Sequence, residues 1–235
     1  MISYPSPNFG DRPIAPDTVI LHYTGMQSAK QSLARLCDPA AEVSAHYLID
    51  EQGACFQLVH PDKRAWHAGV SHWAGRDNAN DWSIGIELQN PGHEFGYRPF
   101  PKAQIDQLLA LLDQLRSDFS IPQHNYIGHS DVAPLRKQDP GALFPWNALF
   151  EEGFGVMPNP EATAVSEKSM SFVDTKEQLT AIGYLIEDET SHTAALTAFK
   201  AHFMAVEDHK AELTDEVAAC LNAVRKAFAS ARAPS

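Results

Sequence analysis

Cysteine is scarce in this chain of 235 residues, which contains only Cys37, Cys55 and Cys220. An odd number of cysteines at these wide spacings is typical neither of a disulfide framework nor of a cysteine-based metal site. Cysteines without disulfide partners indicate a reducing compartment. The compact metal-binding motif HExxH is absent as well, so any metal site must be assembled from separate segments.

Basic residues are outnumbered, with 18 Lys and Arg against 30 Asp and Glu, which gives a net charge of −12. Nucleic acid and anionic membrane surfaces would repel such a chain, so neither is expected as a partner. Hydrophobic residues make up 44% of the sequence, which is ample for a buried core. No stretch approaches the roughly 20 apolar residues of a membrane span.

The N-terminal segment, MISYPSPN, has neither a basic segment nor an apolar run of signal-peptide length. We therefore expect the chain as written to be cytoplasmic. A periplasmic or envelope location is expected instead if a leader has been removed.

Strand and helix patterns alternate over the first two thirds of the chain. Residues 18–24 and 84–88 show the period of two that is typical of strands, and the apolar residues of 105–119 recur at helical spacing after Pro101. These patterns predict a mixed α/β domain over residues 1–158. Glycine, proline and small residues then predict a linker over 159–171.

Every pattern beyond the linker is helical, so residues 172–235 are expected to form a small all-α domain of three helices. One short helix is expected to end at Gly183, and Thr214 is a suitable cap for the last helix. Two apolar stripes at helical spacing support this interpretation: Leu196, Phe199 and Phe203, and then Val217, Cys220, Leu221, Val224 and Phe228.

Two polar side chains lie in strands of the first domain. His22 alternates with Leu21 near the end of VILHYTG, and Glu87 alternates with Ile86 and Leu88 in SIGIELQN. An acid inside an apolar strand is costly unless it is paired, ligated or protonated. Glu87 is therefore a candidate functional residue.

Two further polar side chains lie in segments that are expected to be loops, His129 in YIGHSDVAP and Asp139 in RKQDPG. Two imidazoles and one carboxylate form a ligand set that catalytic zinc sites use, with a fourth position left for water. The alternative is that each histidine is a partly buried residue hydrogen-bonded within the fold. Spacing alone does not decide between these two interpretations.

The candidate residues belong to a longer series of motifs that spans roughly residues 1–155. In chain order these motifs are LHYTG, SAHYLID, RAWHAG, IGIELQN, GHSDVAP and KQDPG. Together they resemble the zinc-dependent N-acetylmuramoyl-L-alanine amidase family, which includes AmpD-type and AmiD-type enzymes and animal peptidoglycan-recognition proteins. The resemblance implies a mixed central sheet flanked by helices and one Zn²⁺ per chain in a groove on one face.

The resemblance also implies roles for individual residues. His22, His129 and Asp139 match the zinc ligands, Glu87 matches the catalytic acid, and Lys137 matches a lysine that stabilises the oxyanion. The alternative for Lys137 is an ordinary solvated loop lysine. Further residues match positions that line the substrate groove: Tyr23, His46, Arg64, Trp66, His67 and Asn90.

Two of these groove residues have equally good structural interpretations. Trp66 could be a core residue, and His46 could be hydrogen-bonded inside the sheet. Four other histidines match no motif and are expected at the surface or in supporting positions: His60, His72, His93 and His124.

The C-terminal segments LTAIGYL and ALTAFKAHF resemble the peptidoglycan-binding domain that is attached to many cell-wall hydrolases. The glutamine that usually follows Ala-Phe is replaced by Lys200, and the usual Asp-Gly turn is absent. The alternative is a helical pack that only stabilises the first domain.

The leading hypothesis is a monomeric zinc enzyme that hydrolyses the amide between N-acetylmuramic acid and L-alanine, in peptidoglycan or in its (anhydro)muropeptide fragments, for cell-wall recycling or remodelling. One alternative is a receptor that binds muropeptides without cleaving them. Another is a lytic, phage-type amidase that acts on whole walls.

Overall fold

The computed structural model describes residues 1–158, 171–207 and 212–233. Its strands are β1 (Ile2–Ser3), β2 (Phe9–Asp11), β3 (Thr18–Tyr23), β4 (Tyr47–Ile49), β5 (Cys55–Gln57), β6 (Lys63–Ala65), β7 (His72–Trp73), β8 (Arg76–Asp77), β9 (Ser83–Leu88) and β10 (Tyr126–Gly128). Its α-helices are α1 (Ala29–Leu36), α2 (Gly92–Phe95), α3 (Lys102–Phe119), α4 (His129–Val132), α5 (Trp146–Glu151), α6 (Phe172–Ile182), α7 (Glu189–Met204) and α8 (Asp215–Ala231).

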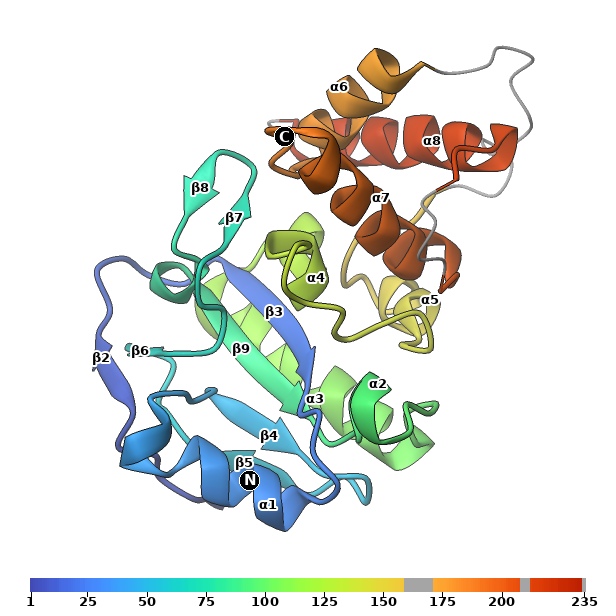
Figure 1. Cartoon of the computed structure of the whole chain (residues 1–235). Coiled ribbons are helices and arrows are strands. Elements are labelled where there is room, and N and C mark those ends of the chain that lie inside the picture. Colours follow the sequence, from blue (N-terminus) through green and yellow to red (C-terminus); the bar gives the residue numbers. More distant parts are fainter. Residues whose placement is uncertain (159–170, 208–211, 234–235) are drawn as a thin grey trace.

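A six-stranded sheet lies at the centre of the first 158 residues, with the strand order β1-β5-β4-β9-β3-β10. The β4–β5 pair is antiparallel, and the other pairs of this sheet are parallel. The predicted class, a mixed sheet flanked by helices with further helices at the C-terminus, is confirmed (Figure 1).

One face of this sheet is covered by α3. Val19 and Leu21 of β3 and Ile84 and Ile86 of β9 belong to the same buried cluster as the apolar side of that helix. Because alternate residues of a strand point to opposite faces, this packing directs the side chains of positions 20, 22, 85 and 87 to the other face. The period of two in the sequence therefore predicted correctly which residues avoid the core beneath the sheet.

The opposite face is covered from two sides. Leu33 of α1 packs against Leu48 of β4, whereas Ile20 of β3 and Ile127 of β10 belong to a cluster with the C-terminal helices. Figure 1 shows α1 below β4 and α4 above β3, with β9 and β3 side by side between them. His22 and Glu87, near the ends of β3 and β9, border a pocket.

The C-terminal helices have the predicted boundaries. Gly183 ends α6, with its N–H donating to the carbonyl of Leu179, and the hydroxyl of Thr214 accepts a hydrogen bond from the N–H of Val217 at the start of α8. The predicted linker lies largely outside the described residues, and the domain boundary near residue 158 stays a prediction.

The C-terminal helices share a core with the α/β part. Ile20, Ile127 and Val132 form one buried cluster with apolar residues of α6, α7 and α8, among them Leu196 and Phe199. The Trp73 ring of the β7–β8 hairpin extends this cluster: its centroid lies 5.0 Å from that of Tyr184 and 6.2 Å from that of Phe228. The helices therefore complete the interior of the α/β part.

Lys200, which departs from the resembled peptidoglycan-binding pattern, is a buried residue of α7. Its ammonium donates a hydrogen bond to the carbonyl of Glu212 at 3.3 Å, just before α8. A buried ammonium needs such partners because desolvation of a charge is costly. The departure from the pattern thus has a structural use, which is to connect α7 with the start of α8.

Asp131 of α4 connects the two parts with polar contacts. Its carboxylate is completely buried and accepts hydrogen bonds from the N–H of Gly128 at 2.7 Å and the hydroxyl of Tyr184 at 2.6 Å. Nδ1 of His202 on α7 lies 2.7 Å from the same carboxylate. A buried carboxylate needs several donors, and two of these come from the C-terminal segment: Tyr184, which follows α6, and His202 of α7.

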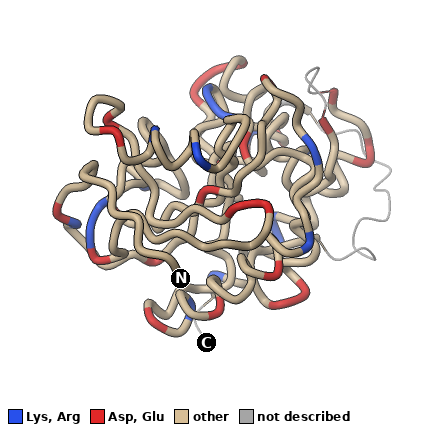
Figure 2. Tube along the Cα trace, turned by 90° about the horizontal axis from the view of Figure 1, so that it is seen from below, with Lys and Arg blue, Asp and Glu red and all other residues tan. Residues whose placement is uncertain are grey.

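Acidic residues are spread over the outside of the molecule and are more frequent than basic ones (Figure 2). In the part of the chain that the structure describes, no helix has the length and hydrophobicity needed to cross a membrane.

We expect Tyr184→Phe to lower the free energy of unfolding by about 1.5–3 kcal/mol, because it removes one hydrogen bond to a buried carboxylate. Urea unfolding followed by circular dichroism measures this change. Tyr4→Phe is the control, since Tyr4 is 42% exposed. Equal stability of the two variants would contradict the role given to Asp131.

Candidate active site

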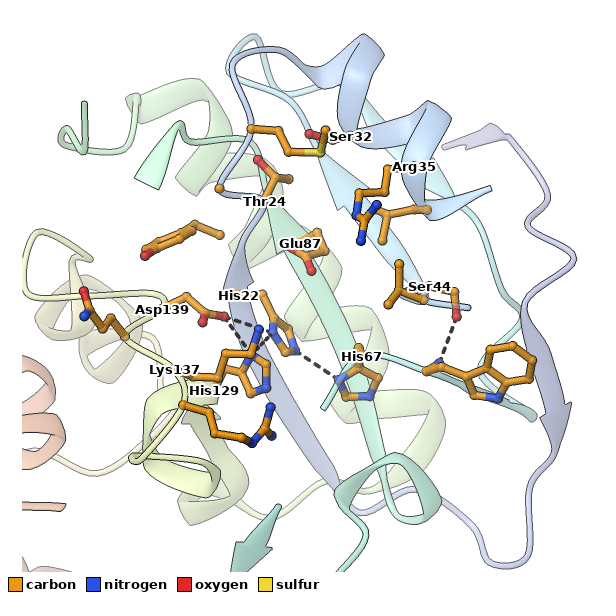
Figure 3. A pocket seen from close by; sticks show the side chains of 18 residues that line it. His22, Thr24, Ser32, Arg35, Ser44, His67, Glu87, His129, Lys137 and Asp139 are labelled. Carbon is orange, nitrogen blue, oxygen red and sulfur yellow. Dashed lines mark hydrogen bonds and ion pairs between the residues drawn. The ribbon is translucent and has the colours of Figure 1, made fainter. Parts of the chain in front are cut away.

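The strands β3 and β9 bring two of the candidate residues together. Their parallel register places His22 directly opposite Glu87, so both side chains leave the same face of the sheet near the ends of their strands. Figure 3 shows the two side chains at the floor of a pocket, with Asp139 and His129 beside His22. The two residues are 65 positions apart in sequence, and strand pairing alone makes them neighbours.

His129 and Asp139 come from one side of this pocket. The expectation that His129 lies in a loop is wrong: it is the first residue of the short helix α4, which directly follows β10. Asp139 does lie in a loop, and the N–H of Ser130 donates to its carbonyl at 2.8 Å. The helix starts at His129 because Asp131 accepts a hydrogen bond from the N–H of Gly128, as a helix-capping carboxylate does.

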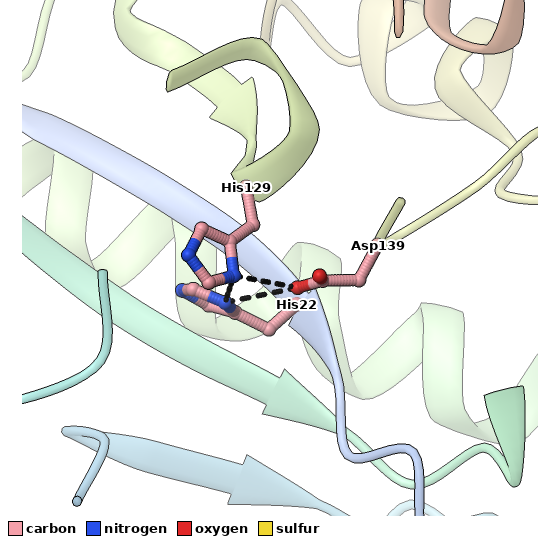
Figure 4. Close-up of side chains that lie close together, drawn as sticks. All are labelled: His22, His129 and Asp139. Atoms are coloured by element: carbon pink, nitrogen blue, oxygen red, sulfur yellow. Dashed lines mark hydrogen bonds and ion pairs between the residues drawn. The ribbon is translucent and has the colours of Figure 1, made fainter. Parts of the chain in front are cut away.

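Three side-chain atoms form a compact triangle (Figure 4). Nδ1 of His22 lies 2.9 Å from Nδ1 of His129 and 3.1 Å from Oδ2 of Asp139, and the third distance, from Nδ1 of His129 to Oδ2 of Asp139, is 3.0 Å. All three residues are buried. The structure thus brings together the three residues that the sequence pattern proposed as metal ligands.

A chain of hydrogen bonds determines which nitrogen of His22 carries its proton. The hydroxyl of Ser83 donates to the carbonyl of Ala79 at 2.5 Å, so its oxygen accepts from Nε2–H of His67 at 3.3 Å. Nδ1 of His67 is then an acceptor and receives Nε2–H of His22 at 3.0 Å. Nδ1 of His22 therefore presents a lone pair to the triangle.

His129 reaches the same state by a shorter route. Its Nε2 lies 3.1 Å from the carbonyl of Ala68, which can only accept, so Nε2 carries the proton and Nδ1 presents a lone pair. Burial, and next the repulsion from His129, lower the pKa of His22 to about 4, which keeps its ring neutral near pH 7. The pKa of Asp139 lies below its ordinary value, so its side chain is a carboxylate that also presents lone pairs to the triangle.

Three lone pairs thus converge within about 3 Å with no proton between them, an arrangement that repels itself unless a cation lies at its centre. Neutral imidazoles and a carboxylate are common metal ligands. The hydrogen bonds made by Nε2 of each histidine orient the ring so that Nδ1 can bind a metal ion. His22, His129 and Asp139 are therefore a group that could hold a metal ion.

Glu87 lies beside this group without belonging to it. Its Oε2 is shielded from solvent and has no hydrogen-bond partner among the described residues. Burial, together with the negative charge of Asp139, raises the pKa of Glu87 well above its ordinary value, and Lys137 opposes this shift. A partly buried carboxyl with a raised pKa is suited to taking up and releasing a proton.

The triangle, Glu87 and Lys137 line one pocket of about 410 Å³. Three of the six residues predicted to line the groove also border this pocket: Tyr23, Trp66 and His67. His67 in addition holds His22 through the hydrogen bond described above.

The other three predicted groove residues are not part of this pocket. His46 is completely buried and accepts the N–H of Gly85 at 2.9 Å, so the interpretation as a ring bonded inside the sheet holds for it. The side chain of Asn90 donates to the carbonyl of Arg98 at 2.7 Å and braces the turn after β9. Arg64 pairs with Asp81 and borders a neighbouring hollow next to Trp66.

Sequence analysis missed the supporting role of Ser83 and of Gly85. Both precede Glu87 at intervals of two in β9, so they share its face of the sheet, and this alternation could have identified them. A Cβ atom on Gly85 would lie 2.3 Å from Cγ of His67, so the ring can lie beneath β9 only because this residue is glycine. His93, expected in a supporting position, lies with its Nδ1 2.8 Å from the hydroxyl of Tyr23.

A mixed sheet with a His-His-Asp group that could hold a metal ion, and with a shielded carboxyl next to it, is typical of metal-dependent hydrolases. The profile of the N-acetylmuramoyl-L-alanine amidase family matches residues 11–142, more than half of the chain. The chain belongs to this family.

Two curated relatives illustrate the range of similarity. The chain is 34% identical over 206 residues to the N-acetylmuramoyl-L-alanine amidase AmiD of Escherichia coli, a match that covers 79% of this chain and 74% of that protein. It is 45% identical over 105 residues to the 1,6-anhydro-N-acetylmuramyl-L-alanine amidase AmpD of Enterobacter cloacae, which covers 45% of this chain and 54% of that protein.

Solved structures extend the likeness beyond the catalytic part. The complex of AmiD from E. coli with anhydro-N-acetylmuramic acid-L-Ala-D-gamma-Glu-L-Lys has a TM-score of 0.82 at 31% identity and covers 91% of this chain and 90% of its own. AmpDh3 from Pseudomonas aeruginosa has a TM-score of 0.83 at 32% identity, with 91% and 92% covered. Coverage of 91% is more than residues 1–158 can supply, so the match reaches into the C-terminal helices.

We expect Gly85→Ala to weaken metal binding by roughly 10–100-fold, because the new methyl group displaces the His67 ring that orients His22. Competition with a chromogenic chelator, using Zn²⁺ as the probe, measures the affinity. Gly10→Ala is the control, since nothing lies within 4 Å of its added Cβ. A wild-type affinity in Gly85→Ala would rule out this supporting role for His67.

Proposed function

We propose that this protein hydrolyses the amide bond between the lactyl group of N-acetylmuramic acid and L-alanine in muropeptides or peptidoglycan. The observation that carries the proposal is the convergence of three lone pairs, from His22, His129 and Asp139, next to the shielded carboxyl of Glu87. Family membership and the amidase activities for which AmiD and AmpD are named support the same reaction.

We infer that the metal is one Zn²⁺ per chain. The three ligand atoms already lie 2.9–3.1 Å apart, and two imidazoles with one carboxylate are a set that would hold Zn²⁺. Three protein ligands leave the fourth position for water, as catalytic sites do. Bound zinc supplies Lewis acidity, which lowers the pKa of a water ligand to around 7 and polarises a carbonyl.

Glu87 is the proton carrier in this proposal. Its carboxylate accepts the proton of the attacking water and passes it to the nitrogen of L-alanine as the amide bond breaks. Because the pKa of Glu87 is raised by burial and by Asp139, the carboxyl holds the proton long enough to deliver it to the leaving amine.

Lys137 is the charge stabiliser. It borders the same pocket and lies two residues before Asp139, and its ammonium lowers the pKa of Glu87 through space. We propose that this ammonium faces the carbonyl oxygen of the scissile amide and stabilises the negative charge that develops there. A fixed positive charge at this point stabilises the transition state more than the ground state, and this difference accelerates the reaction.

The intact set of ligands, Glu87 and Lys137 argues against a receptor without activity, because binding alone needs neither a proton carrier nor a charge stabiliser. A lytic enzyme shares this chemistry and differs in its substrate. Loss of turbidity of intact cell walls, compared with cleavage of small anhydro-muropeptides, separates the lytic from the recycling alternative.

The direct test uses purified protein that has been stripped with a chelator and reloaded with Zn²⁺. We expect release of the L-alanyl peptide from a muropeptide by the reloaded protein and none by the stripped protein, as measured by chromatography of the products. If the reloaded protein, with one zinc per chain, released no peptide, the proposed reaction would be wrong.

We expect Glu87→Gln to lower kcat by roughly 10²–10⁴-fold while zinc content stays near one per chain, because the amide cannot accept the proton of water. Asp139→Asn is the contrasting variant and should lose zinc together with activity. Metal analysis and steady-state kinetics on both proteins measure the difference. Loss of zinc in Glu87→Gln would make Glu87 a ligand and contradict its assignment.

A further inference from the structure

The pocket has a second wall, formed by the last turns of α1. Ser32, Arg35 and Leu36 border it from this helix, and their spacing of three and four residues puts them on one side of the helix. Figure 3 shows Arg35 and Ser44 on the side of the pocket away from Asp139 and Lys137, with Glu87 and His67 between the two groups. The triangle of His22, His129 and Asp139 therefore lies at one end of the pocket, and Arg35 lies at the other.

Arg35 differs from the other cations that border this pocket, Arg136 and Lys137. The guanidinium of Arg136 donates to the carbonyls of Ala68 and Val70, and Lys137 adjoins the reacting groups. In residues 1–158, 171–207 and 212–233, no hydrogen bond or ion pair involves the side chain of Arg35. An unpaired guanidinium facing a pocket is notable in a chain of net charge −12, since 30 acidic residues could supply partners.

The substrate in the AmiD complex shows where a complementary charge lies. In anhydro-N-acetylmuramic acid-L-Ala-D-gamma-Glu-L-Lys the glutamate is joined through its γ-carboxyl, so its α-carboxylate is free. The carboxyl of the lactyl group is consumed in the scissile amide, and the anhydro sugar carries no charge. All the carboxylates of such a substrate are therefore on the peptide side of the bond that is cleaved.

We propose that Arg35 binds the free α-carboxylate of the γ-linked D-glutamate, so that the stem peptide runs from the metal group towards α1. This inference rests on the proposed amidase function. It adds a residue that recognises D-glutamate, the second residue of the stem peptide. Two extended residues span about 7 Å, and the long arginine side chain adds further reach. The planar guanidinium matches a carboxylate with two parallel hydrogen bonds.

The position of Arg35 in the last turn of α1 has a second consequence. A cation there interacts favourably with the negative end of the helix dipole and stabilises α1. This effect is the same for every substrate. A role in recognition, in contrast, depends on whether the substrate carries the carboxylate, so a pair of substrates separates the two.

The experiment compares two muropeptides that differ in one group, the α-carboxylate of D-glutamate or the α-carboxamide of D-isoglutamine. The proteins are the zinc-loaded wild type, Arg35→Ala, Arg35→Lys and the control Lys30→Ala. Lys30 is an exposed cation of the same helix that does not border the pocket. The measured quantity is the ratio of kcat/KM for the carboxylate substrate to kcat/KM for the carboxamide substrate.

We expect the wild type and Lys30→Ala to prefer the carboxylate substrate by about tenfold, the lower end for a hydrogen bond to a charged group at an exposed site. Arg35→Ala should lose this preference by a fall in kcat/KM for the carboxylate substrate alone, and Arg35→Lys should restore part of it. Higher salt should reduce the preference of the wild type, because the pair is exposed.

The proposal would be overturned by an Arg35→Ala variant that keeps the wild-type ratio, whether its two kcat/KM values are unchanged or fall equally. If the wild type cleaves neither muropeptide, the amidase function fails instead. Calorimetric titration of the same two muropeptides into wild type and Arg35→Ala then still tests recognition, and equal affinities of the two proteins for the carboxylate form would overturn it.

Discussion

Mutual repulsion of three buried lone pairs is the constraint on which the rest of the site depends. Neutral imidazoles and a carboxylate do not gather at 2.9–3.1 Å unless the fold holds them there. The sheet holds His22, the start of α4 holds His129, and a backbone hydrogen bond from Ser130 holds the loop of Asp139. A rigid arrangement of this kind favours binding of a cation, because the free-energy cost of bringing the ligands together is met during folding.

Much of this arrangement follows from local sequence patterns. Alternation in 18–24 and 84–88 predicted which face His22 and Glu87 occupy, and helical spacing predicted α3 and the C-terminal helices. These predictions succeed because period two and period 3.6 are properties of the backbone itself. The start of α4 at His129 was missed because this helix has only four residues, too few for helical spacing to show in the sequence.

The residues that sequence analysis misplaced or missed depend on how distant segments meet. His46 and Asn90 lie in motifs of the family, but their side chains support β9 and the turn after it instead of lining the pocket. Arg35 lies in no motif, and only the packing of α1 on Leu48 turns its side of the helix towards the pocket. Periodicity predicts on which side of a helix or strand a residue lies. It does not predict which other segment, or which pocket, that side faces.

The single cluster that joins Ile20 and Ile127 to α6–α8 has a consequence for biosynthesis. Chains emerge from the ribosome N-terminus first, and domains with a core of their own fold as they emerge. Ile20 lies in the same strand as His22, and its buried cluster stays incomplete until the helices α6–α8 have been made. The α/β part of the molecule thus acquires its complete interior only after these helices have been made, so a chain that stops before α6 exposes apolar surface at β3 and β10.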